Sequence, residues 1–279
     1  MKRKTKMSLA VLVILSMAIS ILAACSPADT ANPVIRLSTT TSVNDSGLLS
    51  YLQPEFEKDT EFRLEITSAG SGAAIEKGRT GDADCLLVHS PAAERDFVGE
   101  GFGEQRVPFM HNFFVIVGPA DDPAGVRDST SASEAFMKIA DHPDATFVSR
   151  GDESGTHAAE MRIWGITGMD PTGEDWYMST GQGMGASLTV ANQMGAYILT
   201  DKSTYLAHES RGSLVILLEK SDEMKNIYSI IAISPERWDN TNIDGSNAFL
   251  EWMTSERGLW LIDQYGIAEF GEQLFFSGE

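Results

Sequence analysis

The stretch VIRLSTTTSVNDSGLLSYLQPEF, residues 34–56, decides the class of fold. Its first four residues are mostly apolar and include two β-branched side chains, which is typical of a short buried strand. Five consecutive hydroxyl side chains follow at residues 38–42, and residues 48–56 then space their apolar side chains along one face of a helix. A strand that leads through a polar loop into a helix is the building unit of α/β proteins, so this stretch predicts an α/β fold.

The same pattern continues along the chain. Residues 63–66 predict a second strand, residues 73–77 a short helix, and residues 85–88 a third strand. The loop at residues 67–72 again carries hydroxyls and glycines. In open α/β sheets ligands bind beyond the carboxyl ends of the strands, where such loops run into helices. Cys85 lies in an apolar run, so we expect a small core residue rather than a catalytic thiol.

A third loop, SRGDESGT at residues 149–156, concentrates groups that bind anions. It opens a predicted helix at residues 157–164, and a helix start presents unpaired N–H groups and the positive end of the dipole. Arg150 adds a permanent positive charge with five donors, and the hydroxyls of Ser154 and Thr156 add two more. The alternative is ordinary structure: Ser154 caps the helix, and Arg150 pairs with Asp152 at the surface.

Two apolar segments define the domain organisation. Residues 112–118 (NFFVIVG) and 226–232 (NIYSIIA) both predict strands, and if both cross between lobes, the chain leaves a first lobe near 115 and returns near 230. We therefore expect lobe 1 at 34–115 and 230–279, and lobe 2 at 116–229. The large apolar residues of the C-terminal helices, including Trp252 and Trp260, are expected to pack in the core.

The N-terminal residues predict a secretory signal. Four cationic side chains precede an apolar run at residues 7–24, and Cys25 follows Leu-Ala-Ala. This ending resembles the bacterial lipobox, in which the cysteine becomes the lipidated first residue. We expect a lipoprotein signal peptide at 1–24 and a tether at 25–33, with an uncleaved membrane helix as the alternative. Lipidation of Cys25 leaves Cys85 without a disulfide partner.

Charge narrows the range of partners. The chain has a net charge of −19, and because the first 24 residues hold four cations and no acidic residue, the remainder carries −23. This charge excludes nucleic acid and an anionic membrane surface as electrostatic partners. An anionic ligand must therefore be held by a local cluster of donors, since distant carboxylates are screened within about 8 Å at physiological salt.

Five motifs, in order along nearly the whole mature chain, make the sequence resemble the tungstate-binding proteins of ABC importers. They are TTTS at 39–42, DSGLL at 45–49, GDAD at 81–84, SRGD with SGTH between 149 and 157, and STGQGMG at 179–185. The resemblance implies a two-lobed type II periplasmic-binding-protein fold with two hinge crossings. It also implies an extracytoplasmic receptor, lipid-anchored to the cell membrane or periplasmic, that is monomeric, needs no cofactor and delivers tungstate to the permease subunits.

The resemblance also implies which residues contact the oxyanion in the interlobe cleft. The implied ligand residues are Thr41, Ser42, Ser71, Arg150, Ser154, Gly155 through its amide, and Thr156. Asp152 would orient Arg150 without touching the anion, as in phosphate-binding proteins of the same fold.

His89 stands where those phosphate binders carry an aspartate that accepts the proton of the ligand. Phosphate keeps a proton at neutral pH, whereas tungstate, molybdate and sulfate only accept hydrogen bonds. A carboxylate would repel a fully ionised anion, so its absence favours tungstate or molybdate over phosphate. His89 is equally open to interpretation as an ordinary residue at the end of a strand, and the residues do not separate tungstate from molybdate.

A secreted hydrolase is the rival class. Ser71 or Ser154 with His157 and Asp152 contains the residue types of a catalytic triad, but the Gly-x-Ser-x-Gly elbow is missing from the sequence. His157 and Glu160 have a spacing found in metal sites but no second histidine cluster accompanies them. We therefore expect neither catalysis nor a bound metal cation.

Overall fold

The computed structural model describes residues 33–208 and 212–278. The predicted signal peptide, the lipidation site at Cys25 and all but the last residue of the tether lie outside these residues. In the two described ranges, no helix is both long and apolar enough to cross a membrane.

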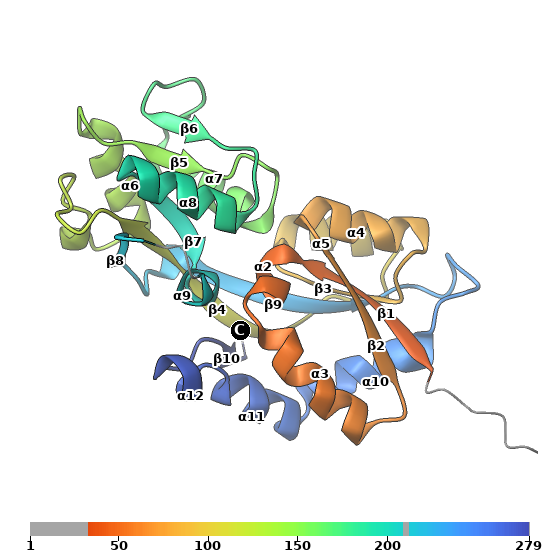
Figure 1. Cartoon of the computed structure of the whole chain (residues 1–279). Helices are drawn as coiled ribbons and strands as arrows, with labels where there is room; N and C mark the ends of the chain where they lie inside the picture. The colour runs from red at the N-terminus through yellow and green to blue at the C-terminus, as the bar shows by residue number, and fades with distance from the viewer. Residues whose placement is uncertain (1–32, 209–211, 279) are drawn as a thin grey trace, which may run out of the picture. The chain divides into compact units, whose positions relative to one another are not determined.

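Strands and helices alternate through most of the chain, as Figure 1 shows. The strands are β1 Val34–Thr40, β2 Arg63–Ala69, β3 Cys85–Val88, β4 Val107–Gly118, β5 Phe147–Ser149, β6 Tyr177–Ser179, β7 Tyr197–Asp201, β8 Val215–Leu218, β9 Lys225–Ala232 and β10 Phe276–Ser277. The helices are α2 Thr41–Asp45, α3 Leu48–Asp59, α4 Ser71–Thr80, α5 Pro91–Gly99, α6 Ala132–Asp141, α7 Gly155–Thr167, α8 Met184–Met194, α9 Lys202–Ala207, α10 Ile243–Thr254, α11 Glu256–Gln264 and α12 Ile267–Phe270, with 3-10 turns η1 Val126–Asp128 and η2 Asp222–Met224.

The strands pair in the order β2-β1-β3-β9-β4-β7-β5-β6, with β8 and β10 also on β4. Strands β2, β1 and β3 run parallel to one another, and so do β6, β5 and β7. The long strand β4 joins the two groups, because it pairs with β9 up to Phe113 and with β7 from Phe114 onward. The two halves and the two long strands between them are those of the two-lobed type II fold.

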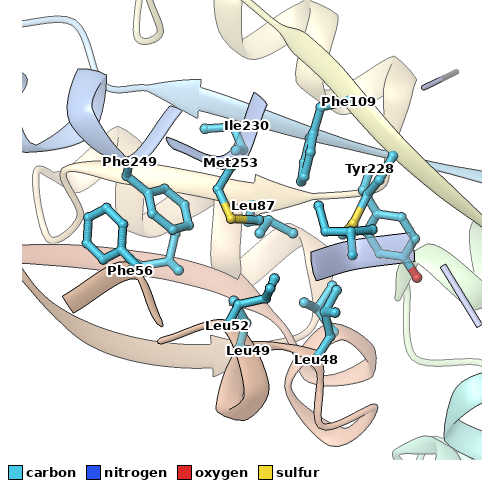
Figure 2. Packing of buried hydrophobic residues seen from close by; sticks show 14 of the residues in the cluster. Leu48, Leu49, Leu52, Phe56, Leu87, Phe109, Tyr228, Ile230, Phe249 and Met253 are labelled. Carbon is cyan, nitrogen blue, oxygen red and sulfur yellow. The ribbon is translucent and has the colours of Figure 1, made fainter. Parts of the chain in front are cut away.

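Two large apolar clusters lie on either side of this change of partner. One brings α3 together with the C-terminal helices, where Phe56 packs edge-on against Phe249 and Trp252 (Figure 2). The other is centred on the aromatic side chains of Phe136, Phe147 and Trp164. Each half therefore has its own core, and the C-terminal helices contribute to the first one.

The core assignments from the sequence hold except for one tryptophan. Cys85 is completely buried in β3, and Trp252 is buried in α10. The expectation for Trp260 is wrong, since 56% of its surface is exposed. The buried side of α11 carries Leu261, Ile262 and, one turn later, Tyr265. Trp260 lies outside this stripe of buried residues. The prediction placed it in the core because of the size of its side chain, without considering which face of the helix it occupies.

Candidate oxyanion site

Each of the three hydroxyl-rich loops leads from the carboxyl end of a strand into a helix. Thr41 is the first residue of α2, Ser71 the first of α4, and Gly155 the first of α7. The residues in the N-cap positions are Thr40, Gly70 and Ser154. The N-cap of α4 is a glycine without a side-chain cap, whereas the Ser154 hydroxyl caps α7 by accepting from the His157 N–H.

The start of α7 lies directly against residues of the first half. The amide N–H of Gly155 donates a hydrogen bond of 2.8 Å to the Ser71 hydroxyl. A Cβ atom at Gly155 would lie only 2.5 Å from Cε1 of the His89 ring. Residues around Ser71, His89 and Gly155 thus meet at one place, although Gly155 lies more than 60 residues along the chain from the other two.

Arg150 is almost fully buried, with 3% of its surface exposed. Its Nε and Nη2 donate to the same Asp152 oxygen, Oδ2, at 3.1 and 2.5 Å. The other carboxylate oxygen of Asp152 accepts from the backbone N–H of Ser154 at 3.2 Å. Asp152 therefore fixes the guanidinium to the loop before α7, and among the described residues Nη1 contacts no acceptor. Donors of Arg150 remain for another anion, and the role of Asp152 in orienting Arg150 toward that anion stays a prediction.

The Thr156 hydroxyl is a candidate donor to an anion at the start of α7. Its Oγ1 is buried, and within the described part of the chain it has no hydrogen-bond partner. A buried hydroxyl without a partner is costly, by about 1–3 kcal/mol, so such groups usually have a function. Ser154, its neighbour, is also buried and caps α7 by accepting from the His157 N–H at 3.2 Å. That bond uses a lone pair of the Ser154 oxygen and leaves its proton for a further acceptor.

Ser42 and His89, both in the first half, are in hydrogen-bond contact with each other. Ser42 Oγ lies 2.9 Å from Nε2 of His89 and 3.2 Å from Oγ1 of Thr40, and all three side chains are buried. Nδ1 of His89 lies 2.9 Å from Oδ1 of Asn226 on β9. Burial lowers the pKa of His89 to about 4, partly offset by Asp201 and the Asn226 bond, so the ring is neutral near pH 7. Thr41 is half-buried beside Ser42.

The alternative sites do not assemble. His157 Nδ1 accepts from the backbone N–H of Glu153, and Asp152 is engaged with Arg150. Glu160 is buried and accepts from the Tyr177 hydroxyl at 2.5 Å. Across residues 33–208 and 212–278 no group of three His, Cys, Asp or Glu side chains is placed to hold a metal ion.

Two residues that contact the candidate site, Thr40 and Asn226, were not predicted from the sequence. Thr40 holds the Ser42 hydroxyl, and Asn226 holds the His89 ring. One sequence feature could have pointed to Asn226. Both apolar segments that were predicted to cross between the lobes, residues 112–118 and 226–232, begin with an asparagine. These positions face each other in the β4–β9 ladder, with Asn226 Nδ2 donating to Asn112 Oδ1 at 3.0 Å.

The chain is similar to known proteins in sequence and in fold. A family model described as a PBP superfamily domain matches residues 27–257. The tungstate-binding protein TupA of Peptoclostridium acidaminophilum is 43% identical over 86% of this chain and 84% of its own length. A putative ABC transporter anion-binding protein of Haloferax volcanii is 43% identical over 89% of this chain and 73% of its own. The structure of the tungstate-binding protein TupA from Desulfovibrio alaskensis G20 superposes with a TM-score of 0.78 at 41% identity, covering 88% of this chain and 99% of that one.

Proposed function

Because this chain belongs to the PBP superfamily, and within it to the tungstate-binding proteins of ABC transporters, we propose that it is an extracytoplasmic receptor that captures tungstate. The ligand residues in this proposal are Thr41, Ser42, Ser71, Arg150, Ser154, Gly155 and Thr156, with Asp152 and His89 in supporting positions. The receptor hands its cargo to the permease and is held at the membrane through a lipid on Cys25.

The observation that carries the proposal is the buried hydroxyl of Thr156, which has no partner among the described residues and follows the buried Arg150 by six positions at the start of α7. Hydroxyls supply most of the donors and one guanidinium supplies the charge, while the Gly155 N–H already donates to the Ser71 hydroxyl. Asp152 already offsets part of that charge, so the site is not a strongly cationic pocket. Affinity then comes from several short hydrogen bonds in a place that excludes water, where each is stronger than in solution.

The lack of a carboxylate at position 89 favours tungstate or molybdate over phosphate. Hydrogen phosphate has a proton to donate, and its binding is favoured by a carboxylate that accepts it. Here the corresponding position holds an imidazole whose Nε2 is already within hydrogen-bond distance of Ser42. A ligand that only accepts hydrogen bonds suits the hydroxyl donors at Ser71 and Thr156. Molybdate has the same charge and shape as tungstate and remains the first alternative.

Calorimetric titration of the protein without its signal peptide tests the proposal. The panel is tungstate, molybdate, sulfate, phosphate and chromate, each at the same ionic strength. Saturable binding of tungstate, with sulfate and phosphate much weaker, is the expected result. Binding of phosphate alone would contradict tungstate as the ligand. If no oxyanion binds, the receptor function is contradicted and the hydrolase becomes the leading candidate.

A further inference from the structure

A chain of buried polar side chains connects His89 to both long strands. Asn226 on β9 donates from Nδ2 to Oδ1 of Asn112 on β4 at 3.0 Å and to the Tyr228 hydroxyl at 2.8 Å. Asn112 donates in turn to Oδ2 of Asp201 on β7, which also accepts from Tyr228 at 3.2 Å. All of these side chains are at least nine-tenths buried.

This network decides which nitrogen of His89 carries the proton. Both N–H groups of the Asn226 amide face acceptors, at Asn112 and at Tyr228, so its Oδ1 is the atom that faces His89. An amide oxygen only accepts, hence Nδ1 of His89 is the donor. In a neutral ring the other nitrogen, Nε2, is then a bare acceptor, and the hydroxyl of Ser42 at 2.9 Å donates to it.

The direction of this bond matters for the anion. A serine hydroxyl has one proton, and a proton given to Nε2 of His89 is not available to an oxyanion. The Ser42 oxygen would then turn lone pairs toward a dianion, which is repulsive. If Nε2 carries a proton, the bond reverses: Nε2–H donates to Ser42 Oγ, and the Ser42 proton is free to donate to the anion.

We propose that His89 takes up one proton from solvent when a dianionic oxyanion binds, and that this proton turns the Ser42 hydroxyl from His89 toward the anion. The inference rests on the proposed function, since it needs the anion beside Ser42. The bound dianion and Asp201 stabilise the imidazolium, and Arg150 opposes it. Tyr228, whose ring lies 4.9 Å from that of His89, stays a neutral phenol because burial raises its pKa well above 10.

The sign of the pH dependence follows. The unliganded ring has a pKa of about 4, and binding raises it, so the complex holds more protons than the free protein between these two values. Within this window the affinity for tungstate falls as pH rises, by at most about tenfold per pH unit for one proton. Above the pKa of the complex the affinity no longer depends on this group.

Calorimetry in pairs of buffers with different ionisation enthalpies measures the proton directly. Tungstate is titrated at micromolar concentration and at about pH 5, 6 and 7, so that uptake is sampled across the window. The expected result is uptake that approaches one proton per anion at the lower pH values. In His89→Gln the side-chain amide can donate permanently to Ser42, so this variant should bind tungstate with no proton uptake. His142→Gln, which alters a histidine at the end of α6, is the matched control and should keep the uptake.

Nitrogen NMR of histidine-labelled wild-type protein gives a second readout that needs no variant. The His89 ring should change from one protonated nitrogen to two when tungstate is added. Tungstate binding without proton uptake at any of these pH values, with His89 Nε2 still unprotonated, overturns the inference. Equal uptake in His89→Gln and wild type overturns it as well. Absence of tungstate binding is a different outcome, because it contradicts the proposed function itself.

Discussion

At the scale of single residues, the site is made of groups that are buried and already held in place. Asp152 fixes Arg150, Thr40 contacts Ser42, and the α7 cap orients Ser154. Groups fixed before the ligand arrives lose little conformational freedom on binding, which favours affinity. The exception is Thr156, whose hydroxyl has no partner among the described residues.

The most direct residue-level prediction concerns Arg150. Replacement by alanine removes the only charged donor of the proposed ligand set, and a charged hydrogen bond contributes about 1.5–3 kcal/mol. We expect Arg150→Ala to weaken tungstate binding by roughly 10- to 150-fold in calorimetry. Arg127→Ala, at an exposed position in η1, should leave the affinity unchanged. Equal affinity of Arg150→Ala and wild type would remove Arg150 from the site.

A second residue-level prediction concerns the buried carboxyl of Glu160. Burial raises its pKa to about 7, against the lowering effect of the Tyr177 hydrogen bond. The folded state therefore holds a proton that the unfolded state releases above about pH 4.5, and the stability from this group is lost as pH rises through 7. Urea unfolding should show wild type losing up to roughly 3 kcal/mol relative to Glu160→Gln between about pH 4.5 and 7. A constant difference between the two proteins across this range would contradict the raised pKa.

At the scale of elements, helix α7 is one of the parts of the second half that meet the first. Its first residue, Gly155, has space for no side chain because the His89 ring stands 2.5 Å from the Cβ position. A methyl group there would hold the start of α7 away from Ser71 and His89 and break the amide bond to Ser71. The requirement for glycine is therefore one of close approach between elements rather than of backbone conformation.

Two alanine substitutions in the same helix test this requirement. Gly155→Ala should weaken tungstate binding by about 1–3 kcal/mol, or roughly 5- to 150-fold, since the methyl group overpacks the contact. Gly165→Ala adds the same group where nothing lies within 4 Å and should bind as wild type does. Both affinities are measured by calorimetry. Indistinguishable affinities would show that α7 and His89 do not need to approach this closely.

The elements also show what could be foreseen from the sequence and what could not. The order of strands and helices and the three hydroxyl-rich loops could be predicted, because periodicity and turn residues are local signals. The contact of Gly155 with Ser71, and of His89 with Asn226, joins residues 84 and 137 positions apart, and no local pattern encodes such pairs. The prediction that Trp260 is buried was wrong for a related reason, because helical spacing does not by itself tell which face of a helix packs against the rest of the protein. The lobe boundaries near 115 and 230 and the lipid on Cys25 remain predictions.

At the scale of the whole molecule, the protein is strongly acidic, so the proposed dianionic ligand must be held by local donors. Its net charge of −19 gives no long-range attraction for the guest. Binding must then show as stabilisation of the folded state, in which Ser71 and Gly155 are hydrogen-bonded. A ligand at 100 times its Kd adds about 2.7 kcal/mol to the free energy of unfolding.

For a domain of this size, that stabilisation corresponds to a rise in Tm of roughly 5–10 °C. Differential scanning calorimetry with saturating tungstate measures it. Sodium chloride at matched ionic strength is the control and should shift Tm far less. A tungstate effect no larger than the salt effect would mean that the anion does not engage the folded protein.

The most direct measurement is a crystal structure of the protein grown with tungstate, with diffraction data collected at an absorption edge of tungsten. Tungsten scatters anomalously, so its position is found without assumptions about the surrounding protein. We expect one strong anomalous-difference peak, with the anion around it within hydrogen-bonding reach of Ser42, Ser71, Arg150 and Thr156. The Thr156 hydroxyl should donate to an oxygen of that anion. A peak at any other place, or a Thr156 hydroxyl that does not contact the bound anion, would contradict the proposed site.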